Sequence, residues 1–173
     1  IYTVRTIEDI TVKSADVTQP SKTIATGSST VEESDSYSVG DTVTFQIAGV
    51  IPSYPSNATH ATYSVTDTPD SGLKVDGTTF AVTVGSGESA TTLTKDTDFT
   101  VSSDNGKYTI AFSKPISLAG QTYTITYSAK VMSVNAGNGT VANNAHATFN
   151  PSPYVEGTVD TPDDPATVKT YGF

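Results

Sequence analysis

The chain of 173 residues contains no cysteine, no tryptophan and a single methionine. The absence of cysteine excludes disulfide bonds, thiol catalysis and metal sites built on thiolates. If a protein of this kind is exposed outside the cell, it needs a covalent staple of another type. The sequence is instead rich in Thr, Val and Ser, a composition typical of folds with many short strands.

Positive charge is also scarce, because nine Lys and Arg residues face 18 Asp and Glu residues and give a formal net charge of −9. This balance argues against binding to nucleic acid or to an anionic membrane surface, and we expect neither partner. No signal peptide and no apolar run long enough for a transmembrane helix is present. Since the chain starts within an alternating segment and without Met, we expect it to be an excised piece of a longer protein.

Helical periodicity is absent over any useful length, whereas alternation of apolar and polar residues is strong. The alternating segments are residues 43–47, 80–84, 108–112 and 123–131. Turn-forming sequences separate them, namely Gly40-Asp41, Asp70-Ser-Gly72, Asp76-Gly77, Asp104-Asn-Gly106 and Asn138-Gly139. Short strands joined by tight turns predict an all-β, Ig-like antiparallel β-sandwich.

Three polar residues occupy positions where the alternation of their own strands calls for apolar side chains. Lys22 is in phase with Ile24, Asp67 with Tyr63 and Val65, and Asn143 with Ala145, Ala147 and Phe149. Side chains two residues apart on a strand point to the same face. We therefore expect an amine, a carboxyl and a carboxamide inside the apolar core, where burying any one of them alone would be costly.

These three groups can react with one another if they meet. Burial lowers the pKa of a lysine and raises that of a carboxylic acid, so Lys22 becomes a neutral nucleophile and Asp67 a proton donor. The amine can then attack the Asn143 amide and release ammonia, which leaves an isopeptide bond. Protonated Asp67 can polarise the amide carbonyl and pass a proton to the departing ammonia. Such a reaction is a single turnover and not an enzyme activity.

The order of the three residues along the chain suits this chemistry. Lys22 lies on an early strand, Asp67 on a middle one and Asn143 on the last core strand. Because the first and last strands of a sandwich can be neighbours, we expect the bond to tie the two ends of the domain together and to carry tensile load.

The segments around these residues resemble the isopeptide-forming domains of Gram-positive sortase-assembled pilins, of the CnaA-like sandwich type. The matching segments are Pro20-Ser-Lys-Thr-Ile24, Tyr37-Ser-Val-Gly-Asp-Thr-Val-Thr-Phe45, Tyr63-Ser-Val-Thr-Asp-Thr68, Asp98-Phe-Thr100, Tyr123-Thr-Ile-Thr-Tyr127 and Asn143-Asn-Ala-His-Ala-Thr-Phe-Asn-Pro151. The resemblance covers about residues 18–151. It implies Lys22 as the bonding lysine, Asp67 as the catalytic acid and Asn143 as the bonding asparagine. Asn144 is the adjacent alternative, but its phase places it on the polar face.

The resemblance also implies a domain organisation. Residues 1–17 would be an entry strand and linker from a preceding domain, and residues 18–166 the isopeptide-forming sandwich. Residues 150–166 are expected to loop over its surface, and residues 167–173 to be an exit strand towards a following domain.

The Tyr-Pro-Lys polymerisation motif of pilins is not evident. Lys13 is a candidate sortase acceptor, although a solvated strand lysine is the simpler interpretation. No Leu-Pro-x-Thr-Gly sorting signal is present.

The sequence therefore predicts a structural domain of a pilin backbone or shaft, extracellular and anchored to the cell wall. Its partners would be neighbouring pilin domains, other pilin subunits and a sortase. We expect no cofactor and no metal, because His60 and His146 lack a third ligand and the acidic turns do not follow the EF-hand pattern.

The sequence is also compatible with two alternative functions. One is an adhesive module that presents residues 52–61 and 151–165 to a host protein or glycan. The other is an accessory β-domain of an extracellular glycoside hydrolase, for which no paired carboxylates provide support.

Overall fold

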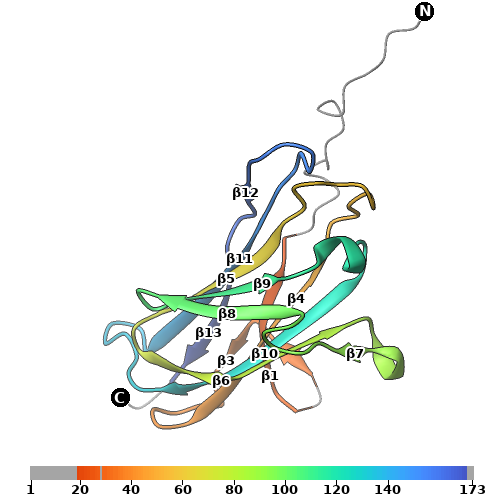
Figure 1. Ribbon diagram of the computed structural model, residues 1–173. Helices are drawn as coiled ribbons and strands as arrows, with labels where there is room; N and C mark the ends of the chain where they lie inside the picture. The colour runs from red at the N-terminus through yellow and green to blue at the C-terminus, as the bar shows by residue number, and fades with distance from the viewer. Residues whose placement is uncertain (1–18, 28, 171–173) are drawn as a thin grey trace, which may run out of the picture.

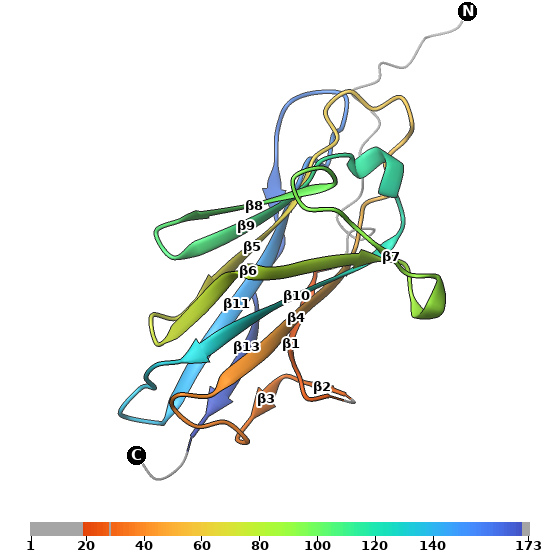
Figure 2. The same cartoon turned by 60° about the horizontal axis from the view of Figure 1, so that its bottom comes forward.

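The computed structural model describes residues 19–27 and 29–170. In this part of the chain thirteen β-strands form two sheets that pack face to face (Figures 1 and 2). The helical segments there are two short 3₁₀ turns, η3 (Gly87–Ser89) and η4 (Pro115–Leu118). Neither is long and apolar enough to cross a membrane. The expectation of an all-β sandwich is confirmed.

The first sheet has six strands in the order β2-β1-β4-β10-β6-β7, and all of its pairs are antiparallel. Its strands are β1 (Ser21–Ala25), β2 (Thr30–Val31), β4 (Thr42–Val50), β6 (Leu73–Val84), β7 (Thr91–Thr92) and β10 (Thr122–Val131). Its centre is formed by the long strands β4, β10 and β6, which carry most of the apolar alternation found in the sequence.

The second sheet has seven strands, in the order β3-β13-β11-β5-β9-β8 with β12 paired to β11. They are β3 (Glu33–Ser34), β5 (Tyr63–Pro69), β8 (Phe99–Asp104), β9 (Lys107–Phe112), β11 (Thr140–Phe149), β12 (Val159–Asp160) and β13 (Asp164–Lys169). The pairing of β13 with β3 is parallel, so this sheet is mixed where a purely antiparallel one was expected.

The core between the sheets follows the predicted alternation. Every second residue of β10 from Tyr123 to Val131 is buried, and so are Val43, Phe45 and Ile47 of β4. Strands β6 and β9 contribute their alternating aromatic and aliphatic residues in the same way, except that Val75 and Tyr108 are only partly buried. Burial of this apolar face is the main favourable term for the fold.

Tight turns form at most of the predicted positions. The β8–β9 hairpin turns on Asn105 and Gly106, whose φ angles of 51° and 77° lie in the left-handed region typical of a two-residue hairpin loop.

The turn predicted at Asp76-Gly77 is wrong, because both residues lie inside β6. The Asp76 carboxylate accepts a hydrogen bond from the Thr78 backbone N–H at 3.0 Å, and the Thr79 hydroxyl donates to the Asp76 carbonyl at 2.7 Å. At this point the pairing of β6 with β10 shifts register between Thr126 and Ser128. The turn-forming residues therefore make a β-bulge instead of a chain reversal.

The C-terminal strand begins earlier than predicted and belongs to the sandwich. Strand β13 pairs with β11 from Asp164 to Lys169 and buries Ala166 and Val168 in the core. The boundary expected at residue 167 thus falls inside β13, because the alternation that fixes the strand starts at Asp164. Residues 1–17, with Lys13, and residues 171–173 lie outside the described residues.

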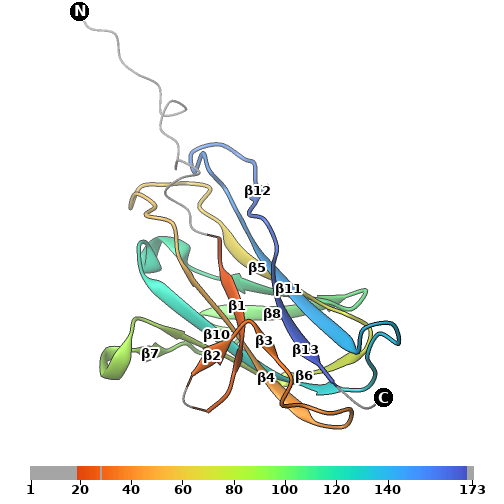
Figure 3. The same ribbon diagram turned by 180° about the vertical axis from the view of Figure 1, so that it is seen from behind.

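Strand β1 begins beside the start of β13, since the Lys22 backbone N–H donates to Asp164 Oδ2 at 2.7 Å. The Gln19 side chain extends this contact by donating to the backbone carbonyls of Pro162 and Asp163. From there the two strands run towards the opposite end of the sandwich (Figure 3). The described chain therefore enters at one end of the domain and leaves at the other.

Candidate functional site

Lys22 reaches the interior from a strand of the first sheet. It lies on β1 opposite Ile47 of β4, and its side chain has no exposed surface. Lysine is almost never fully buried unless it is paired. The position is dictated by the alternation of β1, in which Lys22 and Ile24 are the two buried residues.

Asp67 and Asn143 enter the same space from the second sheet. Asp67 of β5 lies opposite Ala145 of β11, and Asn143 precedes Ala145 by two residues, so both polar side chains share one face. Both are completely buried, whereas Asn144 is only partly buried on the other face. The expected burial of all three polar residues is confirmed.

The strands that carry Lys22 and Asn143 lie in different sheets, so they are neighbours across the core and not within one sheet. Strand β11 is already flanked by β5 and β13, which leaves no open edge for β1. The last core strand is also β13 and not β11. The polar cluster therefore joins the two layers of the sandwich across its core.

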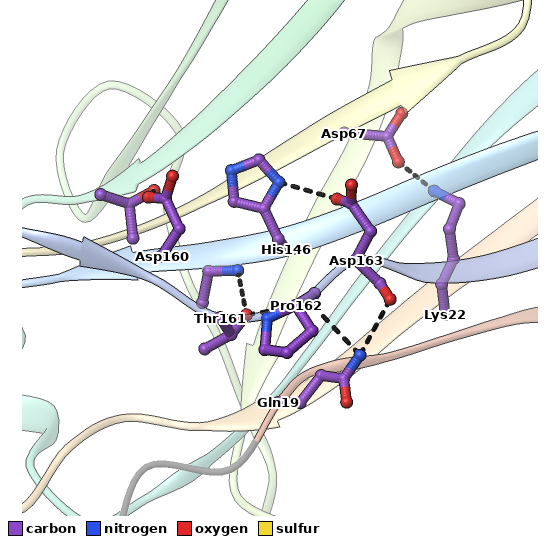
Figure 4. Close-up of polar contacts among 10 residues, drawn as sticks. Gln19, Lys22, Asp67, His146, Asp160, Thr161, Pro162 and Asp163 are labelled. Carbon is purple, nitrogen blue, oxygen red and sulfur yellow. Dashed lines mark hydrogen bonds and ion pairs between the residues drawn. The ribbon is translucent and has the colours of Figure 1, made fainter. Parts of the chain in front are cut away.

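The three side chains belong to one hydrogen-bonded cluster that is joined through the hydroxyl of Tyr127. Lys22 Nζ forms an ion pair with Asp67 Oδ1, and Figure 4 shows the two side chains pointing toward each other. Lys22 Nζ also lies 2.7 Å from the hydroxyl oxygen of Tyr127. That hydroxyl donates to Asp67 Oδ2 at 2.7 Å and accepts a hydrogen bond from Asn143 Nδ2. Asn143 Oδ1 has no hydrogen-bond partner among the described residues.

Tyr127 of β10 is the member of the cluster that the sequence analysis missed. Its phase was assigned to the apolar face, and it is indeed buried between the sheets. The available signal was the hydroxyl itself, because a buried tyrosine normally needs a polar partner for its O–H group. A tyrosine in phase with the core therefore needs a polar partner, and the buried polar residues could have supplied it.

Aromatic rings enclose the reactive groups. Lys22 Nζ lies 4.8 Å from the centroid of the Tyr127 ring and 5.2 Å from that of Phe45. The Tyr127 ring in turn stacks on Phe80, with centroids 4.6 Å apart. These rings separate the cluster from solvent and lower the local dielectric constant, which strengthens every electrostatic interaction within it.

Burial dominates the protonation behaviour of the cluster. Desolvation lowers the pKa of Lys22 and outweighs the attraction of the Asp67 carboxylate, which acts in the opposite direction. Desolvation likewise raises the pKa of Asp67 against the opposing effects of Lys22 and Tyr127. The pKa of Tyr127 lies well above its usual value, mainly through burial. Both shifts of the pair favour a neutral amine beside a neutral carboxylic acid.

The remaining polar contacts near the site hold strands together. His146 Nδ1 lies 2.9 Å from Asp163 Oδ1, and the Thr161 hydroxyl accepts a hydrogen bond from the Ala147 backbone N–H (Figure 4). These contacts fasten the segment between β12 and β13 against β11. Within residues 19–27 and 29–170, no group of three or more His, Asp or Glu side chains is placed to hold a metal ion.

Comparison with known proteins identifies the architecture. No family model matches the chain, and no curated protein matches it by sequence. Among solved structures, the major pilin BcpA of Bacillus cereus superposes with a TM-score of 0.63 at 17% identity, over 87% of this chain and 39% of the pilin. The major pilin SpaA of Corynebacterium diphtheriae gives a TM-score of 0.60 at 23% identity, over 76% of this chain and 31% of the pilin. The chain has the fold of a Gram-positive pilin domain.

The pilin fold is shared with adhesins. The collagen-binding domain of a Staphylococcus aureus adhesin superposes with a TM-score of 0.52 at 13% identity, over 87% of this chain and 96% of that domain. These structural neighbours are pilins and adhesins and not enzymes. The chain spans only about a third of the length of the two pilins.

Proposed function

We propose that this chain is a structural domain of a Gram-positive cell-surface pilin, closed by an autocatalytic isopeptide bond between Lys22 Nζ and Asn143 Cγ. The single observation that carries the proposal is the buried cluster in which Lys22, Asp67 and Asn143 meet across the two sheets. The pilin fold supports it, and the pilin SpaA that shares this fold is described as having a modular assembly with stabilizing isopeptide bonds.

The chemistry assigns one role to each residue. Asp67 takes the extra proton from the Lys22 ammonium, so that the amine has a free lone pair. The amine attacks Asn143 Cγ, the Cγ–Nδ2 bond breaks, and the amide nitrogen leaves as ammonia with one proton that came from Lys22. Once it holds this proton, the neutral Asp67 carboxylic acid can donate a hydrogen bond to the Asn143 carbonyl oxygen and polarise it for the attack, since that oxygen otherwise has no partner among the described residues.

In this role the domain would bear load between neighbouring pilin domains and subunits at the cell surface. A sortase would join the subunits, and Lys13 remains a candidate acceptor for that reaction. The bond between Lys22 and Asn143 suits a load-bearing role, because it joins the sheet that contains β1 to the sheet that contains β13.

The first test is the intact mass of the protein and of two variants. We expect the wild type to be lighter than its sequence mass by one ammonia, because linking Lys22 to Asn143 expels it. Asn143→Ala should show its full sequence mass, since the electrophile is gone. Asn144→Ala is the matched control, because Asn144 points to the other face, and it should still lose ammonia. A wild type with its full sequence mass would refute the proposed bond.

A second test is thermal stability. By analogy with a disulfide, closing a loop of roughly 120 residues stabilises the folded state by about 5 kcal/mol. For a domain of this size that corresponds to a fall in Tm of about 10–20 °C when the bond is removed. We expect Asn143→Ala to show this fall in a calorimetric melt. In an Asp67→Ala background, where no bond forms, the same substitution should cost only a few degrees, and equal losses in the two backgrounds would argue against the bond.

The adhesive alternative rests on the shared fold with collagen-binding domains, but the tyrosines of the loops named for it are engaged within the domain. Tyr54 is buried and shares its single hydroxyl hydrogen between the carbonyls of Thr62 and Asn150, at 2.8 and 2.9 Å. Tyr154 donates to Asn57 Oδ1 at 2.7 Å. The aromatic residues of the two loops therefore fasten the loops to each other and to the sandwich, which favours the structural role.

A further inference from the structure

The hydroxyl of Tyr127 is placed between the two nitrogen atoms whose bonds change in the proposed reaction. It lies 2.7 Å from Lys22 Nζ, the attacking atom, and it accepts a hydrogen bond from Asn143 Nδ2, the leaving atom. Among the described residues no hydrogen bond joins Asn143 to Asp67. The acid assigned to the reaction thus contacts the nucleophile, whereas the hydroxyl contacts the nucleophile, the acid and the leaving group.

We propose that Tyr127 is a catalytic residue that relays a proton from Lys22 Nζ to Asn143 Nδ2 during bond formation. This inference rests on the proposed function, since it specifies how the leaving nitrogen is protonated. An amide nitrogen leaves a tetrahedral centre only as ammonia, so a proton must reach it before the Cγ–Nδ2 bond breaks.

The proton transfers balance without any further reactant. After attack, Lys22 Nζ bears two hydrogens and a positive charge, and the former carbonyl oxygen of Asn143 bears a negative charge. The Tyr127 hydroxyl gives its hydrogen to Nδ2 and takes one from Nζ, so the tyrosine is unchanged at the end. The carbonyl re-forms, the electron pair of the Cγ–Nδ2 bond leaves with ammonia, and Asp67 keeps the proton that it took from the lysine at the start.

The hydrogen-bond capacity of the cluster is consistent with this relay. A hydroxyl has one hydrogen and two acceptor sites, and Tyr127 uses all three, towards Asp67, Lys22 and Asn143. When Asp67 carries its proton it no longer needs the hydrogen of Tyr127, and the hydroxyl can rotate its hydrogen towards Nδ2. The ring does not move in this process, because it is held between Phe45 and Phe80.

The test is the rate of ammonia loss by the full chain after cell-free synthesis, followed by intact mass. Tyr127→Phe keeps the stacked ring and removes only the hydroxyl, and general acid–base catalysis of this type contributes about 100- to 10,000-fold. We therefore expect bond formation to slow by at least about 100-fold. Tyr63→Phe is the matched control, because it removes another buried hydroxyl, paired with Tyr123 at 2.6 Å, away from the cluster. It should react at the wild-type rate.

A second variant separates the relay from packing. Fluorotyrosine introduced at position 127 keeps the ring and the hydroxyl but makes the hydroxyl more acidic, so a proton relay changes its rate whereas a packing role does not. The same substitution at position 63 should have no effect on the rate.

The possible outcomes distinguish this inference from the function on which it rests. If Tyr127→Phe links as fast as the wild type, or if fluorotyrosine at position 127 leaves the rate unchanged, the relay is overturned while the bond stands. If the wild type itself never loses ammonia, the proposed function fails, and the relay fails with it. Slow linking of Tyr127→Phe beside normal linking of Tyr63→Phe supports the relay.

Discussion

Asp67→Ala should fold and yet keep its full sequence mass, because Lys22 loses the group that removes its proton. In the wild type the carboxyl contacts Lys22 Nζ directly, and burial raises the pKa of Asp67 so that it can hold the proton. Without it, the amine either stays protonated and unreactive or is neutral without an acid to polarise the Asn143 carbonyl. Loss of a general acid–base residue slows a reaction by about 100- to 10,000-fold, and we expect no detectable ammonia loss over hours in intact-mass measurements.

The isosteric variant Asp67→Asn sharpens this test. It keeps the volume and one hydrogen-bonding oxygen but cannot take up the proton of Lys22, so it should also remain unlinked. Asp164→Asn is the matched control, since Asp164 Oδ2 accepts a hydrogen bond from the Lys22 backbone and not from its amine. That variant should lose ammonia as the wild type does. Linking in Asp67→Asn at the wild-type rate would remove Asp67 from the mechanism.

Pulling the protein by its two ends should extend the wild type far less than the unlinked Asn143→Ala variant. Force entering β1 would pass from Lys22 through the bond to Asn143, and the chain between these residues would carry no load. Only the residues before Lys22 and those after Asn143, which include β13, would lie in the path of the force. A fully extended chain spans roughly 3.5 Å per residue, so shielding roughly 120 residues shortens the extension by about 400 Å.

Single-molecule force spectroscopy measures this difference as the gain in contour length on unfolding. Asn144→Ala serves as the control, because it changes a carboxamide on the same strand without removing the electrophile, and it should extend as little as the wild type. Equal gains for the wild type and Asn143→Ala would mean that no covalent link crosses the sandwich, whatever the stability of the fold.

Much of the fold could be predicted from local sequence pattern. The alternation on β4 and β10 predicted which side chains are buried, because residues two apart on a strand necessarily face the same way. Turns with a left-handed requirement, such as Asn105-Gly106, were also predictable, since few residues adopt that backbone conformation. The Asp76-Gly77 bulge was not, because the same residues suit a turn or a bulge and only the pairing of β6 with β10 decides between them.

The candidate site also has features that the sequence predicted and one that it did not. The burial of Lys22, Asp67 and Asn143 followed from their phase, and the preference for Asn143 over Asn144 followed from the same argument. The role of Tyr127 could not be predicted, because alternation only places its side chain in the core, as it does for any aromatic residue that serves packing alone. Only the packing of β10 against β5 and β11 places its hydroxyl among the three polar groups.

The sequence by itself thus determined which polar side chains lie inside the sandwich, because that depends on local alternation alone. The tertiary structure decided which groups they meet. It placed Lys22 in one sheet and Asn143 in the other, inserted β13 beside β11, and brought the Tyr127 hydroxyl to the centre of the cluster. The reason is that strand order and sheet-to-sheet packing are set by contacts between residues far apart in the chain, which no local pattern encodes.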